Sequence, residues 1–477
     1  MQVSNDALNT SSKGGKNLLG ISIIAALAGF IFGFDTVVIS GANQPIKDLW
    51  QTTGISPWFH GFFIMSMALW GTVIGAIFGG GPTEKFGRKK VLLWIGIFFT
   101  VSSVGSAVAQ DPYTFSFFRF LGGLGIGISS VAAPTYISEI STPQTRGRLG
   151  AMYQFNIVFG ILIAFLSNYF LKGVDGANDW RWMLGVMALP SLIYTLLVFG
   201  IPESPRWLVA RKNNDSGARK VLQTLGIQNA EEEIVAIRRA AESESQNTKT
   251  SFFSARYNRI LWLAFLVAFF NQWSGINFIL YYAPEILERA GLASKDSLLN
   301  SIAIGGTNLV FTFVGLYLID KAGRKALLIW GSIGYIISLG MVAYAFYAHA
   351  SPEFLLSFLL LFIASHAIGQ GAVIWVFISE IFPNRIRALG QSFGASVHWV
   401  FAAIITLITP VFLDADHGVF KDNPWPIFAF FAFMMLLQLI WVLTKVPETK
   451  GVSLEALEKQ LVIADQVDKD EVIKNRI

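Results

Sequence analysis

The stretch GFIFGFDTVVISG, residues 29–41, places a single carboxylate inside an apolar run. That run extends from Leu18 to Ser40 and is long enough to cross a hydrocarbon core of about 30 Å as one helix. A charged carboxylate at that depth costs about 2.5–3.5 kcal/mol, so we expect Asp35 to be paired, protonated or in a water-filled cavity. The alternative is a polar helix-end residue at the outer headgroup level. Gly29 and Gly33 share one helix face and are expected to let another backbone or a ligand approach closely.

The composition extends this interpretation to all 477 residues. Hydrophobic residues make up 53% and charged residues 14%, and the mean hydropathy is +0.53. These values indicate a polytopic protein of the lipid bilayer rather than two or three soluble domains. The excess of Lys and Arg over acidic residues, 36 against 31, is small and lies in loops, so no nucleic-acid binding is expected. The chain has no cysteine, which excludes disulfides and thiolate metal sites, and we expect neither a metal nor a cofactor.

Hydrophobic windows predict twelve membrane-spanning helices, six on each side of a polar insert. The windows are residues 18–40, 59–80, 91–109, 113–137, 149–170, 182–200, 258–282, 299–319, 326–348, 354–379, 388–412 and 425–444. The first is too long for the apolar core of a signal peptide and has no clear cleavage site, so we interpret it as an uncleaved helix.

Basic residues cluster in alternate short loops, as at Lys85, Arg88, Lys321 and Arg324. By the positive-inside rule these loops, the insert and both termini are expected to be cytoplasmic in a plasma membrane of bacterial type.

The hydrophobic pattern divides the chain into four parts: an N-terminal six-helix part at 1–202, an insert at 203–256, a C-terminal six-helix part at 257–446 and a tail at 447–477. In the insert, Asn229 and Glu232 form the pattern of a capping box for a helix beginning at Ala230, with Ile234 and Ile237 on one face. A solvated helical linker is the plain interpretation, and a regulatory latch is the alternative. The tail includes a short amphipathic segment at 454–461.

Three motifs occur once in each half at nearly constant spacing, which indicates duplication. The turn EKFGRK at 84–89 recurs as DKAGRK at 320–325, and PES at 202–204 recurs as PET at 447–449. Glu139 and Arg146 likewise correspond to Glu380 and Arg387. Such charges can form ion pairs that close the inner face and must break when it opens, although each charged turn alone could merely orient its helices. The candidate gate residues are Glu84, Arg88, Glu139, Arg146, Glu203, Arg206, Asp320, Arg324, Glu380, Arg387 and Glu448.

Together with these repeats, four segments resemble the sugar porter family of the major facilitator superfamily, and the resemblance covers essentially the whole chain. They are RFLGGLGIG at 119–127, PESPRWL at 202–208, QWSGIN at 272–277 and PETKG at 447–451. The resemblance implies an all-α membrane protein of the major facilitator fold, with twelve transmembrane helices in two pseudo-symmetric six-helix bundles and a cytoplasmic helical linker. It also implies alternating access around one central monosaccharide site.

The resemblance implies a set of sugar-contacting residues as well. They are Phe32, Gln154, Asn271, Gln272, Asn277, Tyr281, Asn308, Trp375 and His398. Amides offer both donors and acceptors to sugar hydroxyls, and an indole offers an apolar face to a pyranose ring. Each amide taken alone could instead form a hydrogen bond between helices.

The chain departs from the family pattern at three places. Asn271 stands where a glutamine is usual, and His398 stands where an Asn or Gln usually precedes the tryptophan. The segment GAVIW at 371–375 lacks the prolines of animal glucose carriers. We therefore expect a hexose or pentose in general, rather than glucose in particular. His398 could hydrogen-bond the sugar, titrate near neutrality or bridge two helices.

Asp35 occupies the position that is acidic in the proton symporters of the family and typically neutral in its animal uniporters. The first span runs outward and reaches Asp35 late, whereas the fourth runs inward and reaches Arg119 early, so both are expected in the outer half. A guanidinium beside a carboxylate lowers its pKa, and losing that partner in an apolar setting raises it. The hypothesis is proton-coupled sugar uptake with Asp35 as the proton site and Arg119 as its modulator.

Several alternatives remain open on the sequence alone. A fixed pair of Asp35 and Arg119 is also compatible with facilitated diffusion, and the substrate could be a polyol, inositol or an organic ion. A sugar sensor would be expected to carry a long signalling tail, but only about thirty residues follow the last span. An enzyme is not expected, because no motif brings a nucleophile and a base together. The partners expected are a small sugar, protons and lipid, with the chain working as a monomer.

Overall fold

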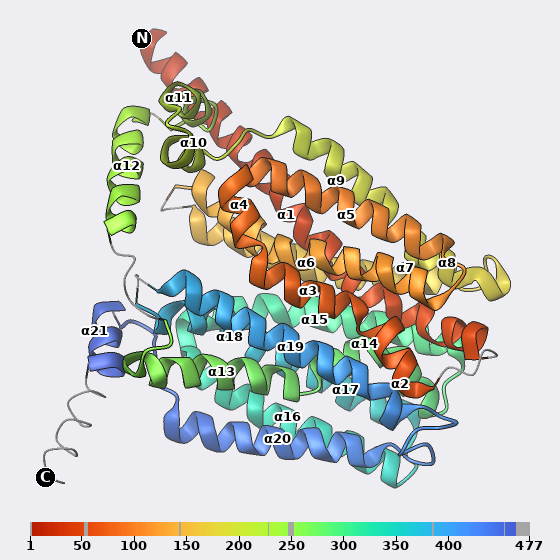
Figure 1. Ribbon diagram of the computed structural model, residues 1–477. Coiled ribbons are helices and arrows are strands. Elements are labelled where there is room, and N and C mark those ends of the chain that lie inside the picture. The colour runs from red at the N-terminus through yellow and green to blue at the C-terminus, as the bar shows by residue number, and fades with distance from the viewer. Residues whose placement is uncertain are drawn as a thin grey trace, which may run out of the picture. The chain divides into compact units, whose positions relative to one another are not determined.

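The computed structural model describes residues 2–51, 56–142, 145–227, 229–246, 252–383, 386–452 and 454–463 (Figure 1). The side chains of residues 2–16, 51, 146, 243–246, 454, 455 and 463 lie outside the description. Every regular element in the described ranges is a helix. Among these residues, eleven helices are long and apolar enough to span a membrane, and the bent pair Pro57–Met65 and Met67–Phe78 makes a twelfth when it is counted as one span. The predicted all-α membrane protein with twelve transmembrane helices is confirmed.

The chain divides into two compact units. Unit 1 comprises Met1–Val38, Trp70–Ser167 and Gly173–Thr248, and unit 2 comprises Ile39–Leu69, Asn168–Lys172 and Lys249–Ile477. The long helix α1 (Gln2–Gln51) therefore begins in unit 1 and ends in unit 2. Two further helices, α3 (Met67–Phe78) and α7 (Arg146–Leu171), also contribute to both units.

The remaining helices of unit 1 follow the predicted spans and the insert. They are α4 (Gly80–Phe86), α5 (Arg88–Val108), α6 (Pro112–Ile140), η2 (Gly176–Asn178), α8 (Asp179–Gly185), α9 (Ala188–Gly200), α10 (Pro205–Lys212), α11 (Asp215–Thr224) and α12 (Ala230–Gln246).

The small face of α1 packs directly on the backbone of α7. A Cβ at Gly33 would lie 1.9 Å from the carbonyl oxygen of Ile157, and one at Gly29 would lie 2.7 Å from that of Tyr153. Only glycine permits this approach, because any larger side chain would overlap the backbone of α7. The prediction that Gly29 and Gly33 admit a close neighbour is confirmed, and the neighbour is a helix of the same unit.

The insert forms a small helical cluster, visible as α10, α11 and α12 in Figure 1. Its apolar core contains Val209, Ala218, Leu222, Ala230, Ile234 and Ile237. The predicted helix start at Ala230 is confirmed, and the amide of Asn229 donates to the Glu232 carboxylate at 3.0 Å. The predicted apolar face with Ile234 and Ile237 is also confirmed.

Unit 2 contains the second set of spans and the beginning of the tail. Its helices are α2 (Pro57–Phe59), η1 (His60–Met65), η3 (Ala255–Tyr257), α13 (Asn258–Trp273), α14 (Ile276–Arg289), α15 (Ser294–Ala322), α16 (Arg324–Tyr347), α17 (Pro352–Ile368), α18 (Gln370–Ile381), α19 (Arg387–Leu413), α20 (Trp425–Lys445), α21 (Leu454–Glu458) and η4 (Lys459–Ile463). Leu457 and Leu461 of the amphipathic tail segment belong to the same apolar core as α13 and α18.

Two spans of unit 2 that the sequence predicts as continuous are broken. The window 258–282 divides into α13 and α14 at Ser274 and Gly275, and the window 354–379 divides into α17 and α18 at Gly369. Gly275 has φ 87°, which ends the helical path at that residue. Hydropathy does not reveal such breaks, because the average over a whole span stays apolar across them. The break at Gly275 brings polar side chains of α13 and α14 together.

Candidate transport site

Asp35 on α1 and Arg119 on α6 form a buried ion pair within unit 1. The Arg119 guanidinium lies 2.5 Å from Oδ1 of Asp35, and both side chains are almost completely buried, with 0% exposure for Asp35 and 2% for Arg119. The guanidinium also donates to the backbone carbonyl of Asp35 at 3.4 Å. Oδ2 of Asp35 and Nε of Arg119 have no hydrogen-bond partner among the described residues. The ion pair therefore engages only one of the two carboxylate oxygens of Asp35.

The local sequence positions Arg119 at this depth. Asp111 caps the start of α6 by accepting from the backbone N–H groups of Tyr113 and Thr114, at 3.0 and 2.9 Å, and Pro112 occupies the first helical position. Arg119 follows two turns later on the helix. A Cβ at Gly122, one turn beyond, would lie 3.9 Å from Oδ2 of Asp35. The small side of α6 therefore faces the free carboxylate oxygen.

A network of amides occupies the break between α13 and α14 in unit 2. Gln272 donates to Oδ1 of Asn271 at 3.0 Å and accepts from Asn277 at 2.8 Å. Its amide nitrogen also lies 3.1 Å from the His398 imidazole of α19. The ring of Trp375 on α18 lies 5.0 Å from that of His398. The structure thus brings five of the predicted sugar-contacting residues together within one unit.

The other predicted sugar-contacting residues have different positions. Phe32 on α1 and Gln154 on α7 belong to unit 1, where Phe32 is buried and Gln154 is partly exposed. Tyr281 on α14 and Asn308 on α15 are buried in unit 2. No hydrogen bond among the described residues joins Asn308 to Gln272.

The Gly-Arg-Lys turn of unit 1 forms a cage of carboxylates around Arg88. The guanidinium bonds both oxygens of Glu139 at 2.9 and 2.8 Å and also donates to Glu84 at 2.7 Å. Glu203 accepts from the backbone N–H groups of Arg88 and Lys89, at 2.9 and 3.0 Å. It therefore caps the start of α5, which has no side-chain cap at its own N-cap position.

The corresponding turn of unit 2 repeats this arrangement around Arg324. Its guanidinium bonds both oxygens of Glu380 at 3.1 and 2.8 Å and approaches Asp320 at 3.3 Å. Glu448 accepts from the backbone N–H groups of Arg324 and Lys325, at 2.9 and 3.0 Å, and so caps α16. The side chain of Thr449 adds a hydrogen bond to Glu380 at 2.6 Å.

Three further residues were predicted to belong to the gate. Arg387 donates through Nε to the backbone carbonyl of Phe382 at 3.3 Å. Arg206 lies in the first turn of α10. The side chain of Arg146 falls outside the described residues.

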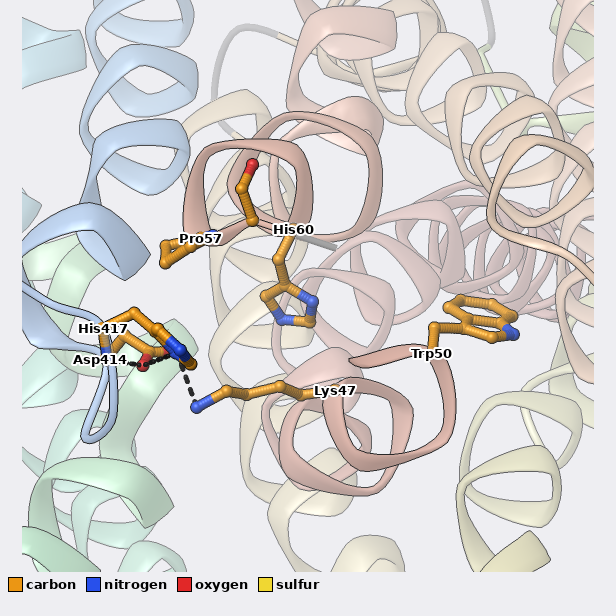
Figure 2. Close-up of a pocket in the computed structure, with 7 residues that line it drawn as sticks. Lys47, Trp50, Pro57, His60, Asp414 and His417 are labelled. Carbon is orange, nitrogen blue, oxygen red and sulfur yellow. Dashed lines mark hydrogen bonds and ion pairs between the residues drawn. The ribbon is translucent and has the colours of Figure 1, made fainter. Parts of the chain in front are cut away.

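Polar contacts at the other end of unit 2 were missed by the sequence reasoning. Lys47 of α1 pairs with Asp414 at 2.6 Å, and Figure 2 shows its side chain reaching toward Asp414 beside His60. Asn43 donates to Glu285 of α14 at 2.8 Å. The available signal was their charge: Lys47 and Glu285 lie just beyond the predicted windows 18–40 and 258–282, and the structure extends both spans to include them.

Burial would raise the pKa of Asp414, but hydrogen bonds from Lys47 and from the backbone N–H of His417 outweigh it and lower that pKa. Asp414, Asp416 and His417 lie close enough together to share a metal ion, with possible ligand atoms within 4.8 Å. The ammonium of Lys47 already supplies positive charge to this group, at 2.6 Å from Asp414 and 3.8 Å from Asp416. An internal ion pair therefore accounts for the cluster.

The helices, their paired charged turns and the intramembrane ion pair define a multi-pass membrane transporter with the major facilitator fold. Residues 21–461 match the family model described as "Sugar (and other) transporter". The chain belongs to this sugar transporter family.

Curated relatives and a solved structure agree with this assignment. The chain is 34% identical to the arabinose-proton symporter of Bacillus subtilis, over 92% of this chain and 94% of that protein. It is 35% identical to a glucose transport protein of Synechocystis, over 93% and 97% of the two chains. The inward-open structure of the xylose transporter from Escherichia coli matches with a TM-score of 0.81 and 30% identity, over 93% of this chain and all of that one.

Proposed function

We propose that this protein carries a monosaccharide, a hexose or a pentose, across the bacterial plasma membrane together with a proton. The observation that carries the proposal is the buried pair of Asp35 and Arg119, in which Oδ2 of Asp35 has no partner among the described residues. The names of the relatives support it, because they include proton symporters of arabinose, xylose and galactose.

The proton step follows from the chemistry of the pair. With Arg119 in contact, the carboxylate of Asp35 is stabilised as an anion, and separating the two leaves that anion in apolar surroundings. Protonation removes the charge and the cost of the separation. Movement of α1 relative to α6 is thereby linked to proton binding, which is the requirement for coupling.

The sugar site proposed here contains Gln272, Asn277, Asn271, Trp375 and His398. Three of the amides bond one another, and a sugar hydroxyl, which both donates and accepts, can insert between two of them and keep both groups paired. Trp375 is 38% exposed and offers its indole face to a sugar ring. Phe32, Gln154, Tyr281 and Asn308 complete the proposed set.

We also propose the orientation and the moving parts. The turns at Arg88 and Arg324 face the cytoplasm, both termini are cytoplasmic, and the bundles 1–202 and 257–446 move as alternating halves of a monomer. The linker at 203–256 joins them, and 447–477 forms a tail. The gate residues named from the sequence, Arg146, Arg206 and Arg387 included, stabilise the inner face when it is closed.

The test is uptake of labelled hexoses and pentoses into proteoliposomes, with and without an inward proton gradient. The native chain is expected to accumulate sugar above equilibrium only with the gradient. Asp35→Asn keeps the size of the side chain but cannot exchange a proton, so its accumulation ratio is expected to fall to 1. Asp296→Asn, the same substitution at an exposed position of α15, is the matched control and should accumulate sugar normally.

Two results would contradict this proposal. Gradient-dependent accumulation that persists in Asp35→Asn would exclude Asp35 as the proton site. Equilibration that ignores both the gradient and Asp35 would make the protein a facilitated-diffusion uniporter, with the ion pair serving structure alone.

A further inference from the structure

Four helical segments meet at one polar cluster in unit 2, which we name the Asn43 clamp. It consists of Asn43 and Lys47 on α1, His60 on η1, Glu285 on α14 and Asp414 after α19. Nδ2 of Asn43 donates to Oε2 of Glu285 at 2.8 Å, and Oδ1 of Asn43 lies 2.7 Å from Nε2 of His60. Asn43 and His60 are buried, with exposures of 3% and 6%. One amide therefore connects α1 to both η1 and α14.

The clamp lies at the end of unit 2 that is remote from the Arg324 turn. Glu285 and the first residue of α15, Ser294, line the same cavity, and α15 ends beside Arg324. The 29 residues of α15 correspond to about 40 Å along the helix axis. The clamp and the Arg324 cage therefore occupy opposite ends of the unit.

The side-chain amide of Asn43 determines which of its partners donates a hydrogen bond and which accepts one. Because its Nδ2 donates to Glu285, its Oδ1 must accept, and His60 must donate through Nε2–H. A hydrogen bond to a charged carboxylate is roughly twice as strong as one to a neutral group. Placing a proton on Glu285 would thus weaken the contact that joins α1 to α14.

Several charged groups surround Glu285, but among the described residues none of them forms an ion pair with it. They are Lys47 on α1, Lys172 after α7, Asp414 after α19, and Glu288 and Arg289 on α14 itself; His60 faces it through Asn43. Lys47 is committed to Asp414 at 2.6 Å. A carboxylate in a membrane span without an ion-pair partner is a candidate proton site.

A small cavity of about 20 Å³, large enough to hold a water molecule, lies beside Glu285. Ser40, Asn43, Lys172 and Glu288 also line it, and the buried hydroxyl of Ser40 has no hydrogen-bond partner among the described residues. Glu285 therefore combines an exchange route for protons with a contact that depends on its charge.

We propose that Glu285 is a second proton-binding site, and that its protonation loosens the Asn43 clamp and frees α1 and η1 from α14. Asp35 lies eight residues before Asn43 on the same helix, so Asp35 belongs to the helix that Glu285 contacts through Asn43. The inference does not depend on Asp35 being the coupling site.

The absence of cysteine allows a direct test, because Ser40→Cys introduces a single thiol into the clamp cavity. The protein is placed in nanodiscs, and the rate of maleimide labelling is measured between pH 8 and pH 5.5. Each rate is divided by that of the same thiol in the unfolded chain at the same pH. The corrected rate is expected to rise about fivefold on acidification, the factor that corresponds to the loss of about 1 kcal/mol of clamp strength.

Glu285→Gln mimics the protonated state and is expected to label fast at both pH values. Glu288→Gln is the matched control, because Glu288 lines the same cavity but Asn43 donates its hydrogen bond to Glu285, and it should keep the pH response. Asn43→Ala removes the hydrogen bond by a second route, and fast labelling independent of pH is expected.

A pH response that survives in both Glu285→Gln and Asn43→Ala would overturn the proposal. So would a response that is absent from the parent Ser40→Cys protein. The same measurement in Asp35→Asn separates the two sites. A pH response that is preserved in Asp35→Asn supports Glu285 as the proton site. A pH response that is lost in Asp35→Asn but preserved in Glu285→Gln assigns the proton to Asp35 instead.

Discussion

The Arg88 turn of unit 1 and the Arg324 turn of unit 2 are two versions of one device. In each, a glycine with positive φ precedes the arginine, 96° at Gly87 and 94° at Gly323. In each, a distant glutamate caps the helix that the arginine begins. This agreement extends to atomic distances, so the two turns share one backbone arrangement even where their side chains differ.

The two turns differ in how deeply their ion pairs are buried. The Arg88 and Glu139 side chains are 6% and 7% exposed, whereas those of Arg324 and Glu380 are 11% and 22% exposed. Glu84 lies 2.7 Å from Arg88, but the shorter Asp320 lies 3.3 Å from Arg324 and is 80% exposed. Removing one partner of an ion pair costs more stability when the pair is less exposed to water, because the remaining charge is left buried. The comparison teaches that equivalent motifs can have unequal energies.

The largest expected difference between the turns is in their bidentate glutamates. Glu139→Ala leaves the Arg88 guanidinium buried and is expected to destabilise the protein by about 3–5 kcal/mol. Glu380→Ala leaves Arg324 with more water and is expected to cost about 1.5–3 kcal/mol. Unfolding of the purified variants in detergent by heat or by denaturant measures both values. Equal losses would show that the difference in burial has no energetic consequence.

The glycines are expected to behave alike, which tests the conserved part of the comparison. A Cβ at Gly87 would lie 2.4 Å from Oε2 of Glu203, and one at Gly323 would lie 2.5 Å from Oε2 of Glu448. Each alanine variant therefore combines the clash with an unfavourable backbone conformation, and each should lose about 1–3 kcal/mol in the same unfolding measurement.

Gly80→Ala provides the matched control for the glycine pair. Gly80 begins α4, and a Cβ there meets no atom within 4 Å. Its stability should remain within about 0.5 kcal/mol of the native chain. A tolerated alanine at either Gly87 or Gly323 would contradict the conserved backbone.

The smallest expected effects belong to Glu84 and Asp320. Burial would raise the pKa of Glu84, but Arg88 and Arg211 outweigh it and hold that pKa below its usual value. Both carboxylates are substantially exposed, so Glu84→Gln should cost about 0.5–1 kcal/mol and Asp320→Asn less than about 0.5 kcal/mol.

The lowered pKa of Glu84 also predicts a pH dependence. A carboxylate whose folded pKa is depressed contributes stability above its unfolded pKa, near 4.3, and loses it as the pH falls through the folded value. The difference in melting temperature between the native chain and Glu84→Gln should stay constant from pH 8 to about pH 5, begin to shrink near pH 4 and disappear at still lower pH. A difference that grows on acidification would have the wrong sign.

The predictable features of this protein were those that depend on local pattern. The apolar windows predicted the twelve spans, because the cost of exposing polar groups to lipid acts on every residue of a span. Gly29 and Gly33 predicted a close helix contact, because their spacing of four residues places both on one face of the helix. The duplicated turns at Arg88 and Arg324 were recognisable because each retains its charges and its glycine.

The candidate site was only partly predictable. Asp35 stood out as a charge in an apolar run, and an estimate of depth suggested Arg119 as its partner. Glu285 and Lys47 had the same kind of signal but went unnoticed, because charges near the ends of predicted spans resemble ordinary boundary residues. His398 was recognised as unusual, but its contact with Gln272 required the break at Gly275 to turn α13 and α14.

The sequence by itself determined the class of fold, the number of spans and the residues able to carry charge into the membrane, because hydropathy and repeated motifs depend on residue type and order. Only the tertiary structure decided which carboxylate oxygen of Asp35 is free, which glutamate caps which helix, and that one amide at Asn43 joins three segments. Those facts depend on the relative rotation and depth of packed helices. That packing is determined jointly by side chains that lie far apart in the sequence, so no single stretch of sequence predicts it.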